Sequence, residues 1–181
     1  MIKKLVKILL KIHFIVTKIL TRLFDFFTSK IINRKLLITH DGKTLFTVRH
    51  FSVLTRFRAT TFSSKEPKTF DWIDGFEKED TFLDIGSSIG IYSLYAAFKG
   101  IQVKAIKPDA LNCALLNLNI EDNSVNKKII AYPFSLHSET KIAELNIGML
   151  QFGGALSSFD RNLDWRVNKL QNGFCKEAQV F

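Results

Sequence analysis

The chain has 181 residues, of which 46% are hydrophobic and 17 are Phe, and its formal net charge is +9 at pH 7. This length suits one domain with an appendage, and the apolar content is sufficient for a packed core. The two cysteines and the four histidines show no paired or metal-binding spacing, so the sequence predicts neither a disulfide framework nor a metal site.

The positive charge is concentrated at the N-terminus. Residues 1–35 contain nine Lys or Arg and one acid, Asp25, which gives a local net charge of +8. The other 146 residues carry 17 basic and 16 acidic groups and are nearly neutral. A nucleic-acid-binding domain would carry its basic residues on one face of the folded body. We therefore expect no nucleic-acid partner. We also expect the basic N-terminal segment to have a function separate from that of the folded body.

Residues 2–27 are predicted to form one amphipathic helix. Its longest uncharged run, residues 12–17, is far shorter than the about 20 apolar residues of a membrane span. We expect a cytoplasmic protein whose helix lies in a membrane interface, with docking on the domain and a targeting signal as alternatives. The basic residues that recur on one face of this helix are Lys4, Lys7, Lys11, Lys18 and Arg22.

The next part of the chain predicts a hairpin and a lead-in helix. Residues 35–50 form two β-prone runs around Asp41-Gly42, a pair that suits a tight turn. Residues 51–62 remain β-prone or irregular, and on a strand Arg56 and Arg58 would point to one side, toward solvent or an anion. Residues 65–76 fit a helix with Pro67 in its first turn.

Residues 80–134 alternate between strand and helix patterns. This order predicts β-α-β-α-β, one half of a doubly wound parallel sheet. A further strand over 141–147 is expected to be antiparallel or outside the main sheet, residues 152–155 a flexible loop, and 160–181 without a defined element. The predicted strands are 81–85, 103–106 and 129–134, and the predicted helices are 89–98 and 110–119, the second capped by Asp109.

The turn after the first parallel strand has the composition of a cofactor loop. Asp84 ends the strand, and Gly86 and Gly90 allow a tight turn and a close approach of ligand to backbone. The N–H groups that open the following helix face the same space. A dinucleotide fingerprint would read GxGxxG, whereas Ser88 holds the middle position here. The spacing is closer to the first motif of S-adenosylmethionine-dependent methyltransferases, and a turn without ligand is the alternative.

With these motifs placed, the chain resembles the FkbM family of S-adenosylmethionine-dependent methyltransferases. The match runs from about Arg58 to Phe159 and is carried, in order, by TFSSKEPKTFDWIDGF, DIGSSIGIYSLYAA, KPDALNCALLNLNI and GGALSSF. The resemblance implies a Rossmann-like α/β fold. It also implies transfer of a methyl group from S-adenosylmethionine to a hydroxyl on a glycan or another small-molecule or lipid-linked acceptor.

The resemblance also implies the residues that hold the cofactor. Lys107 stands where such enzymes carry an acid for the ribose hydroxyls, and an ammonium has no acceptor to offer them. The loss of such a pair costs about 1.5–3 kcal/mol. His137 and Glu139 are expected to be loop residues, and no catalytic base is assigned. The implied cofactor-binding residues in the glycine loop are Asp84, Gly86, Ser87, Ser88 and Gly90.

These observations divide the chain into three segments. Residues 1–35 are the basic amphipathic helix, 36–79 the hairpin and lead-in helix, and 80–181 the N-terminal half of a Rossmann-like methyltransferase domain. Because the family continues into further strands, we expect a truncated chain with strand 81–85 at an exposed edge. Two alternatives remain: a degenerate relic that acts only in membrane or partner association, and a half-domain of a nicotinamide-dependent oxidoreductase.

Overall fold

The computed structural model describes residues 2–32, 34–40, 43–159 and 174–179. The chain forms two compact units, Met1–Arg34 and Lys35–Phe181. The first unit is a single helix, α1 (Ile2–Ile32), which ends five residues later than predicted. No Gly or Pro interrupts this segment, and Lys30 in its last turn complements the helix dipole. In the described part of the chain, no helix has both the length and the apolarity needed to cross a bilayer.

The second unit begins with the predicted β-hairpin. Strands β1 (Lys35–His40) and β2 (Lys43–Arg49) pair antiparallel, and the Asp41-Gly42 turn lies outside the described residues. Ile38, Phe46 and Val48 are buried. One face of the hairpin is therefore part of the hydrophobic core.

The prediction of β-prone or irregular structure over residues 51–62 is wrong. These residues form α2 (Val53–Thr60) and the start of α3 (Phe62–Lys65), followed by α4 (Pro67–Asp74), which begins at the predicted proline. Helix α2 starts at a capping box in which Ser52 and Thr55 exchange hydrogen bonds. Residues spaced by two point in different directions on a helix, so Arg56 is exposed while Arg58 turns inward.

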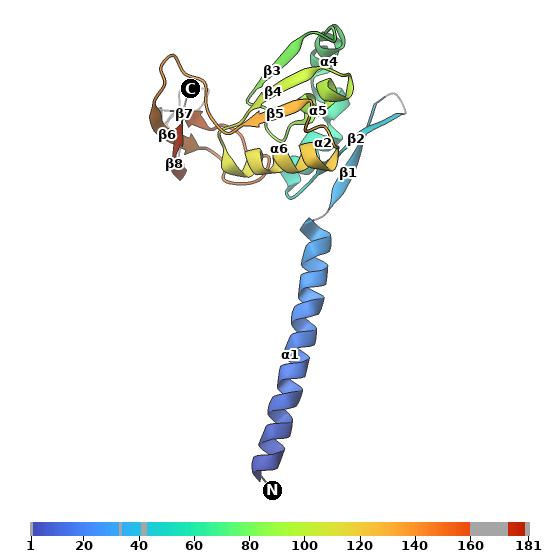
Figure 1. The fold of residues 1–181 in the computed structure, drawn as a ribbon, viewed down its shortest axis with the longest axis vertical. Coiled ribbons are helices and arrows are strands. Elements are labelled where there is room, and N and C mark those ends of the chain that lie inside the picture. The colour runs from blue at the N-terminus through green and yellow to red at the C-terminus, as the bar shows by residue number, and fades with distance from the viewer. Residues whose placement is uncertain (1, 33, 41–42, 160–173, 180–181) are drawn as a thin grey trace. The chain divides into compact units, whose positions relative to one another are not determined.

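The three predicted parallel strands form one sheet in the order β3-β4-β5 (Figure 1). Asp109 caps α6 as predicted, with its carboxylate accepting from the N–H of Asn112 at 2.8 Å. The fold is therefore α/β and compatible with a Rossmann-like arrangement. The elements of this part are β3 (Thr81–Ile85), α5 (Ile91–Phe98), β4 (Gln102–Ile106), α6 (Ala110–Asp122) and β5 (Ile129–Tyr132).

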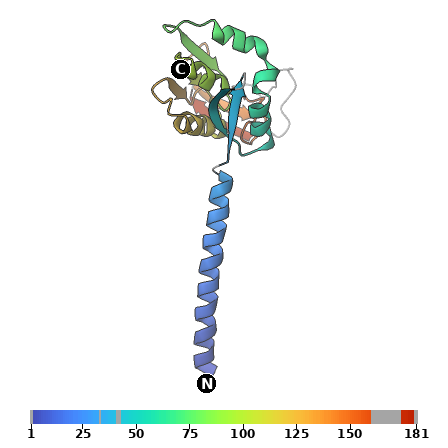
Figure 2. The same cartoon turned by 90° about the vertical axis from the view of Figure 1, so that its right-hand side faces the viewer.

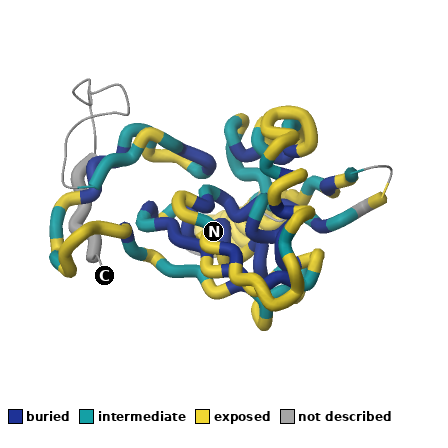
Figure 3. The backbone as a smooth tube through the Cα atoms, turned by 90° about the horizontal axis from the view of Figure 1, so that it is seen from above, coloured by how far each residue is buried: buried dark blue, intermediate teal, exposed yellow. Residues whose placement is uncertain are grey.

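One core joins the hairpin, helices α2 to α6 and one face of the parallel sheet. Figure 2 shows the backbone of this unit from a second side, and Figure 3 marks its buried residues in dark blue. Phe82 and Val103 lie on this face and are buried. On the opposite face Leu83 and Ile85 are 46% and 62% exposed. Among the described residues β3 is an edge strand, with β4 as its one neighbour.

A second sheet has the order β7-β6-β8, with both pairings antiparallel. Its central strand, β6 (Ile142–Ile147), confirms the strand predicted over 141–147, and it is both antiparallel and outside the main sheet. Its neighbours are β7 (Ser158–Phe159) and β8 (Phe174–Gln179), and the second of these lies where no element was predicted. The rest of that stretch, residues 160–173 and 180–181, lies outside the described residues.

The loop at residues 152–155 was predicted to be flexible, but hydrogen bonds hold most of it to two helices. The carbonyl oxygens of Phe152 and Gly153 accept from Ser52 Oγ and Arg58 Nε, at 2.6 and 3.1 Å. The side-chain amide of the buried Asn112 on α6 bonds to the two glycines of the loop. This segment is therefore a fixed connection between α2 and α6.

Candidate cofactor site

The loop between β3 and α5 has a left-handed backbone at three of five consecutive residues. The φ angle is 80° at Gly86, 52° at Ser88 and 85° at Gly90. Glycine adopts such angles without steric cost, so the two glycines make this turn possible. The N–H groups of Gly86 and Ser87 both donate to the carbonyl oxygen of Ile106, at 3.0 and 3.2 Å. The loop is therefore fixed to the carboxyl end of β4.

Helix α6 supports the loop from the core side. A Cβ built on Gly90 would overlap Cδ1 of the buried Leu116, so the backbone of the loop lies directly on this helix. The amide of Asn119, also buried, donates to the carbonyl oxygen of Ile89 at 2.8 Å and accepts from the N–H of Arg49 at 2.9 Å. One side chain thus links the loop, α6 and the hairpin.

Asp84 holds the loop to the helix that follows it. Its half-buried carboxylate accepts hydrogen bonds from the hydroxyl and the backbone N–H of Ser93, in the first turn of α5. Burial raises the pKa of Asp84, while the hydrogen bonds from Ser93 act in the opposite direction. The carboxylate of Asp84 thus joins the end of β3 to the first turn of α5.

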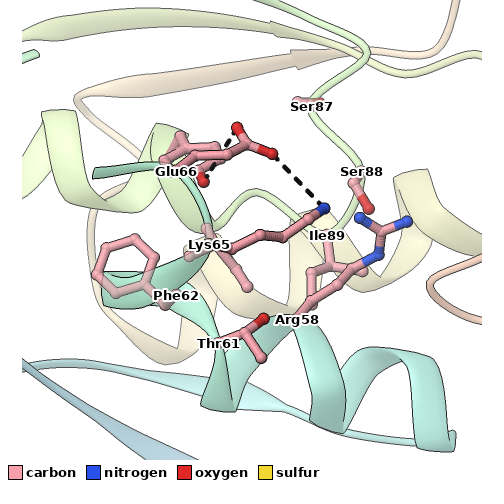
Figure 4. Close-up of a pocket in the computed structure, with 10 residues that line it drawn as sticks. Arg58, Thr61, Phe62, Lys65, Glu66, Ser87, Ser88 and Ile89 are labelled. Carbon is pink, nitrogen blue, oxygen red and sulfur yellow. Dashed lines mark hydrogen bonds and ion pairs between the residues drawn. The ribbon is translucent and has the colours of Figure 1, made fainter. Parts of the chain in front are cut away.

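A pocket opens beside the loop, between its Ser87-Ser88 segment and helices α2 and α3 (Figure 4). It encloses about 420 Å³ of empty space when the open mouth is included. Of the six predicted site residues, only Ser87 and Ser88 line it. The lining residues are Arg58, Thr61, Phe62, Lys65, Glu66, Ser87, Ser88, Ile89, Ile91 and Tyr92.

Arg58 and Ser88 contribute polar groups to the lining of this pocket. The Nε of Arg58 donates to the carbonyl oxygen of Gly153, which leaves the far end of its guanidinium beside Ser88 (Figure 4). The Ser88 hydroxyl is buried and has no hydrogen-bond partner among the described residues. Because a buried polar group without a partner costs about 1–3 kcal/mol, a bound polar ligand atom would relieve this position.

A carboxylate lies at the opposite wall of the pocket. Glu66 is 3.5 Å from the ammonium of Lys65 and accepts a hydrogen bond from the hydroxyl of Tyr92 at 3.3 Å (Figure 4). Burial, together with the nearby Glu66, raises the pKa of Tyr92 to about 12. Tyr92 is therefore a protonated donor near neutral pH, and Glu66 is an acceptor that faces the same space.

Lys107 lies at the end of β4, where the sequence predicts it. The residue is only 9% exposed. Burial lowers the pKa of Lys107, Arg58 lowers it further, and Asp109 opposes both. The position that the resemblance assigns to a ribose-binding acid is thus a buried cation.

The pocket adds residues that were not predicted as site residues. For Arg58 the sequence predicts only a contact with solvent or an anion on a strand, and it predicts no role for Glu66 or Tyr92. Their roles depend on α2 and α3 lying beside the glycine loop, and no local pattern signals that. His137 and Glu139 do not line the pocket; Nδ1 of His137 accepts from the N–H of Glu139 at 3.2 Å.

No protein-family model and no curated protein matches this chain. Within the ranges that the structure describes, no group of His, Cys, Asp or Glu is arranged to hold a metal ion.

Proposed function

We propose that this chain binds S-adenosylmethionine at the glycine loop and transfers its methyl group to a hydroxyl of a glycan or another small-molecule or lipid-linked acceptor. The observation that carries the proposal is the turn from β3 into α5. Its two glycines have positive φ, and a pocket opens beside Ser87 and Ser88. The motifs that resemble the FkbM family add the reaction type.

The residues of the loop fit the amino-acid end of this cofactor. Gly86 has open space where a Cβ would be, so a ligand can approach its backbone. The unpartnered hydroxyl of Ser88 and the first N–H groups of α5 are donors for a carboxylate or a hydroxyl. The guanidinium of Arg58 adds positive charge on the same side. Asp84 then acts by fixing the loop to α5.

When bound, this cofactor supplies a methyl group already activated on a sulfonium. The chain has to hold the acceptor hydroxyl in line and remove its proton. Glu66 has a carboxylate in the pocket and is our candidate to take up that proton, with Tyr92 orienting it. General-base assistance of this kind contributes about 10²–10⁴-fold to a rate.

Lys107 favours a second candidate function, that of a chain which no longer binds the cofactor and acts only through association. The ammonium of Lys107 has no lone pair with which to accept hydrogen bonds from ribose hydroxyls. Its replacement by an acid separates the two functions. We expect Lys107→Glu to bind S-adenosylhomocysteine about 10- to 150-fold more tightly than the wild type. Lys107→Gln, which removes the charge without supplying a carboxylate, is the control.

The first test is a calorimetric titration of the full chain with S-adenosylhomocysteine. Gly86→Ala should weaken binding, because the new methyl group would fill the space that the ligand needs. Gly100→Ala is a matched control, since Gly100 also has a positive φ and open space but lies at the far end of α5. Equal affinities for these two variants would argue against the loop as the site. Binding that appears only in Lys107→Glu would favour the association function.

A further inference from the structure

Helix α1 exposes a wide apolar surface. Considered as a unit by itself, it carries fourteen large apolar side chains that are between 47% and 68% exposed. A monomeric soluble protein rarely leaves a continuous apolar surface of this kind without a partner. At 1.5 Å per residue, its 31 residues extend over about 46 Å. The surface is therefore long as well as apolar.

The basic residues of α1 form a line opposite the centre of the apolar surface. At about 100° per residue, Lys7, Lys11, Lys18 and Arg22 fall within an arc of about 60°. Leu9, Val16, Leu20 and Phe27 lie on the other side of the helix, and all four are exposed. Asp25 is the one acid of the segment. The helix thus has an apolar side and a cationic side, with little charge to offset the basic residues.

The width of the apolar surface indicates whether its partner is a lipid layer or a second copy of the helix. Leu9, Ile12, Val16 and Ile19 follow the three–four spacing of a coiled-coil seam. In a coiled coil, however, the positions that flank the seam carry charges, whereas here they include Ile15 and Leu20. An apolar half-cylinder suits a planar apolar layer better than one narrow partner helix. The basic line complements an anionic surface in particular.

We propose that α1 lies in the interface of a membrane that contains anionic lipids. The apolar side enters the acyl region, and the lysines of the opposite side contact headgroup phosphates. This inference does not depend on methyl transfer, because it uses no residue of the pocket. Electrostatic attraction contributes to the binding, so affinity should fall as ionic strength rises.

The test is flotation of the full-length protein with vesicles. We expect it to float with vesicles of phosphatidylcholine and phosphatidylglycerol, and much less with phosphatidylcholine alone. The double variant Lys11→Glu/Lys18→Glu should bind the anionic vesicles at least about 30-fold more weakly. Each lysine near an anionic surface contributes roughly 1 kcal/mol to binding, and about 1.4 kcal/mol corresponds to a tenfold change in affinity. Lys78→Glu/Lys127→Glu changes the net charge equally on exposed residues of the second unit and should bind as the wild type does.

Three results would overturn the proposal. Equal binding by the two charge-reversed proteins would show that the basic line of α1 plays no part. A full-length protein that stays out of the float fraction and sediments as an oligomer would identify a second copy as the partner of the apolar surface. A monomer that does not float would mean that the chain covers this surface itself.

Discussion

The contact between Gly90 and Leu116 leads to a sharp prediction for the stability of the second unit. In Gly90→Ala, the new residue must adopt a φ of 85°, which costs about 1–2 kcal/mol for an L-residue. Its Cβ also overlaps Cδ1 of Leu116, a fully buried side chain with no room to withdraw. Overpacking of this kind costs about 1–3 kcal/mol more. We therefore expect a total loss of about 2–5 kcal/mol.

The assay is urea unfolding followed by intrinsic fluorescence. Gly86→Ala is the matched variant, because its φ of 80° imposes the same strain but its Cβ meets nothing within 4 Å. Its loss should stop at about 1–2 kcal/mol. A double-mutant cycle with Leu116→Ala isolates the overlap, since the shorter side chain leaves room for the new methyl group. Equal losses for the two glycine variants, or strict additivity in the cycle, would refute the reasoning.

Two further predictions concern the hydrogen bonds and ion pairs that hold the second unit together. Asn112→Leu should lower the free energy of unfolding by about 2–4 kcal/mol, because it leaves the N–H of Gly153 and the carbonyl of Gly154 buried without partners. A loss below about 1 kcal/mol in urea unfolding would contradict this. Hydrogen bonds from Arg49 and the neighbouring Lys35 lower the pKa of Asp122 to about 2. The ionised carboxylate therefore stabilises the folded state above its unfolded pKa near 3.8, and this contribution is lost as the pH falls toward 2. Between pH 4 and pH 2 the wild type should lose about 1–2 kcal/mol more than Asp122→Asn, and parallel pH curves would contradict this assignment.

The sequence predicted the parts of the fold that have a strong local pattern. The hairpin, the three parallel strands and the Asp109 cap follow from alternation, turn residues and capping chemistry, and the structure confirms each. Helix α2 was missed because its β-branched and aromatic residues favour a strand. Its start is determined by the Ser52 cap, and Ser52 also bonds to Phe152, a residue 100 positions away. Tertiary contacts of this range have no local signature.

Only the glycine turn of the candidate site was predictable from the sequence, because its shape depends on the local backbone. The spacing of Gly86 and Gly90 indicated the tight turn, and both residues have the positive φ that such a turn requires. The opposite wall of the pocket comes from α2 and α3, which were not predicted to lie there. Arg58 therefore becomes a site residue only once α2 is known to be a helix held against the loop at residues 152–154.

Asn119 has a consequence for how the second unit folds. Its amide joins the carbonyl of Ile89 to the N–H of Arg49, residues that are 30 and 70 positions away in the chain. Contacts between distant segments form late, because the chain between them must be ordered before they stabilise anything. We therefore expect the glycine loop to reach its final shape only when the hairpin has docked on α6. Recovery of ligand binding during refolding should then coincide with the last kinetic phase, after the helices have formed.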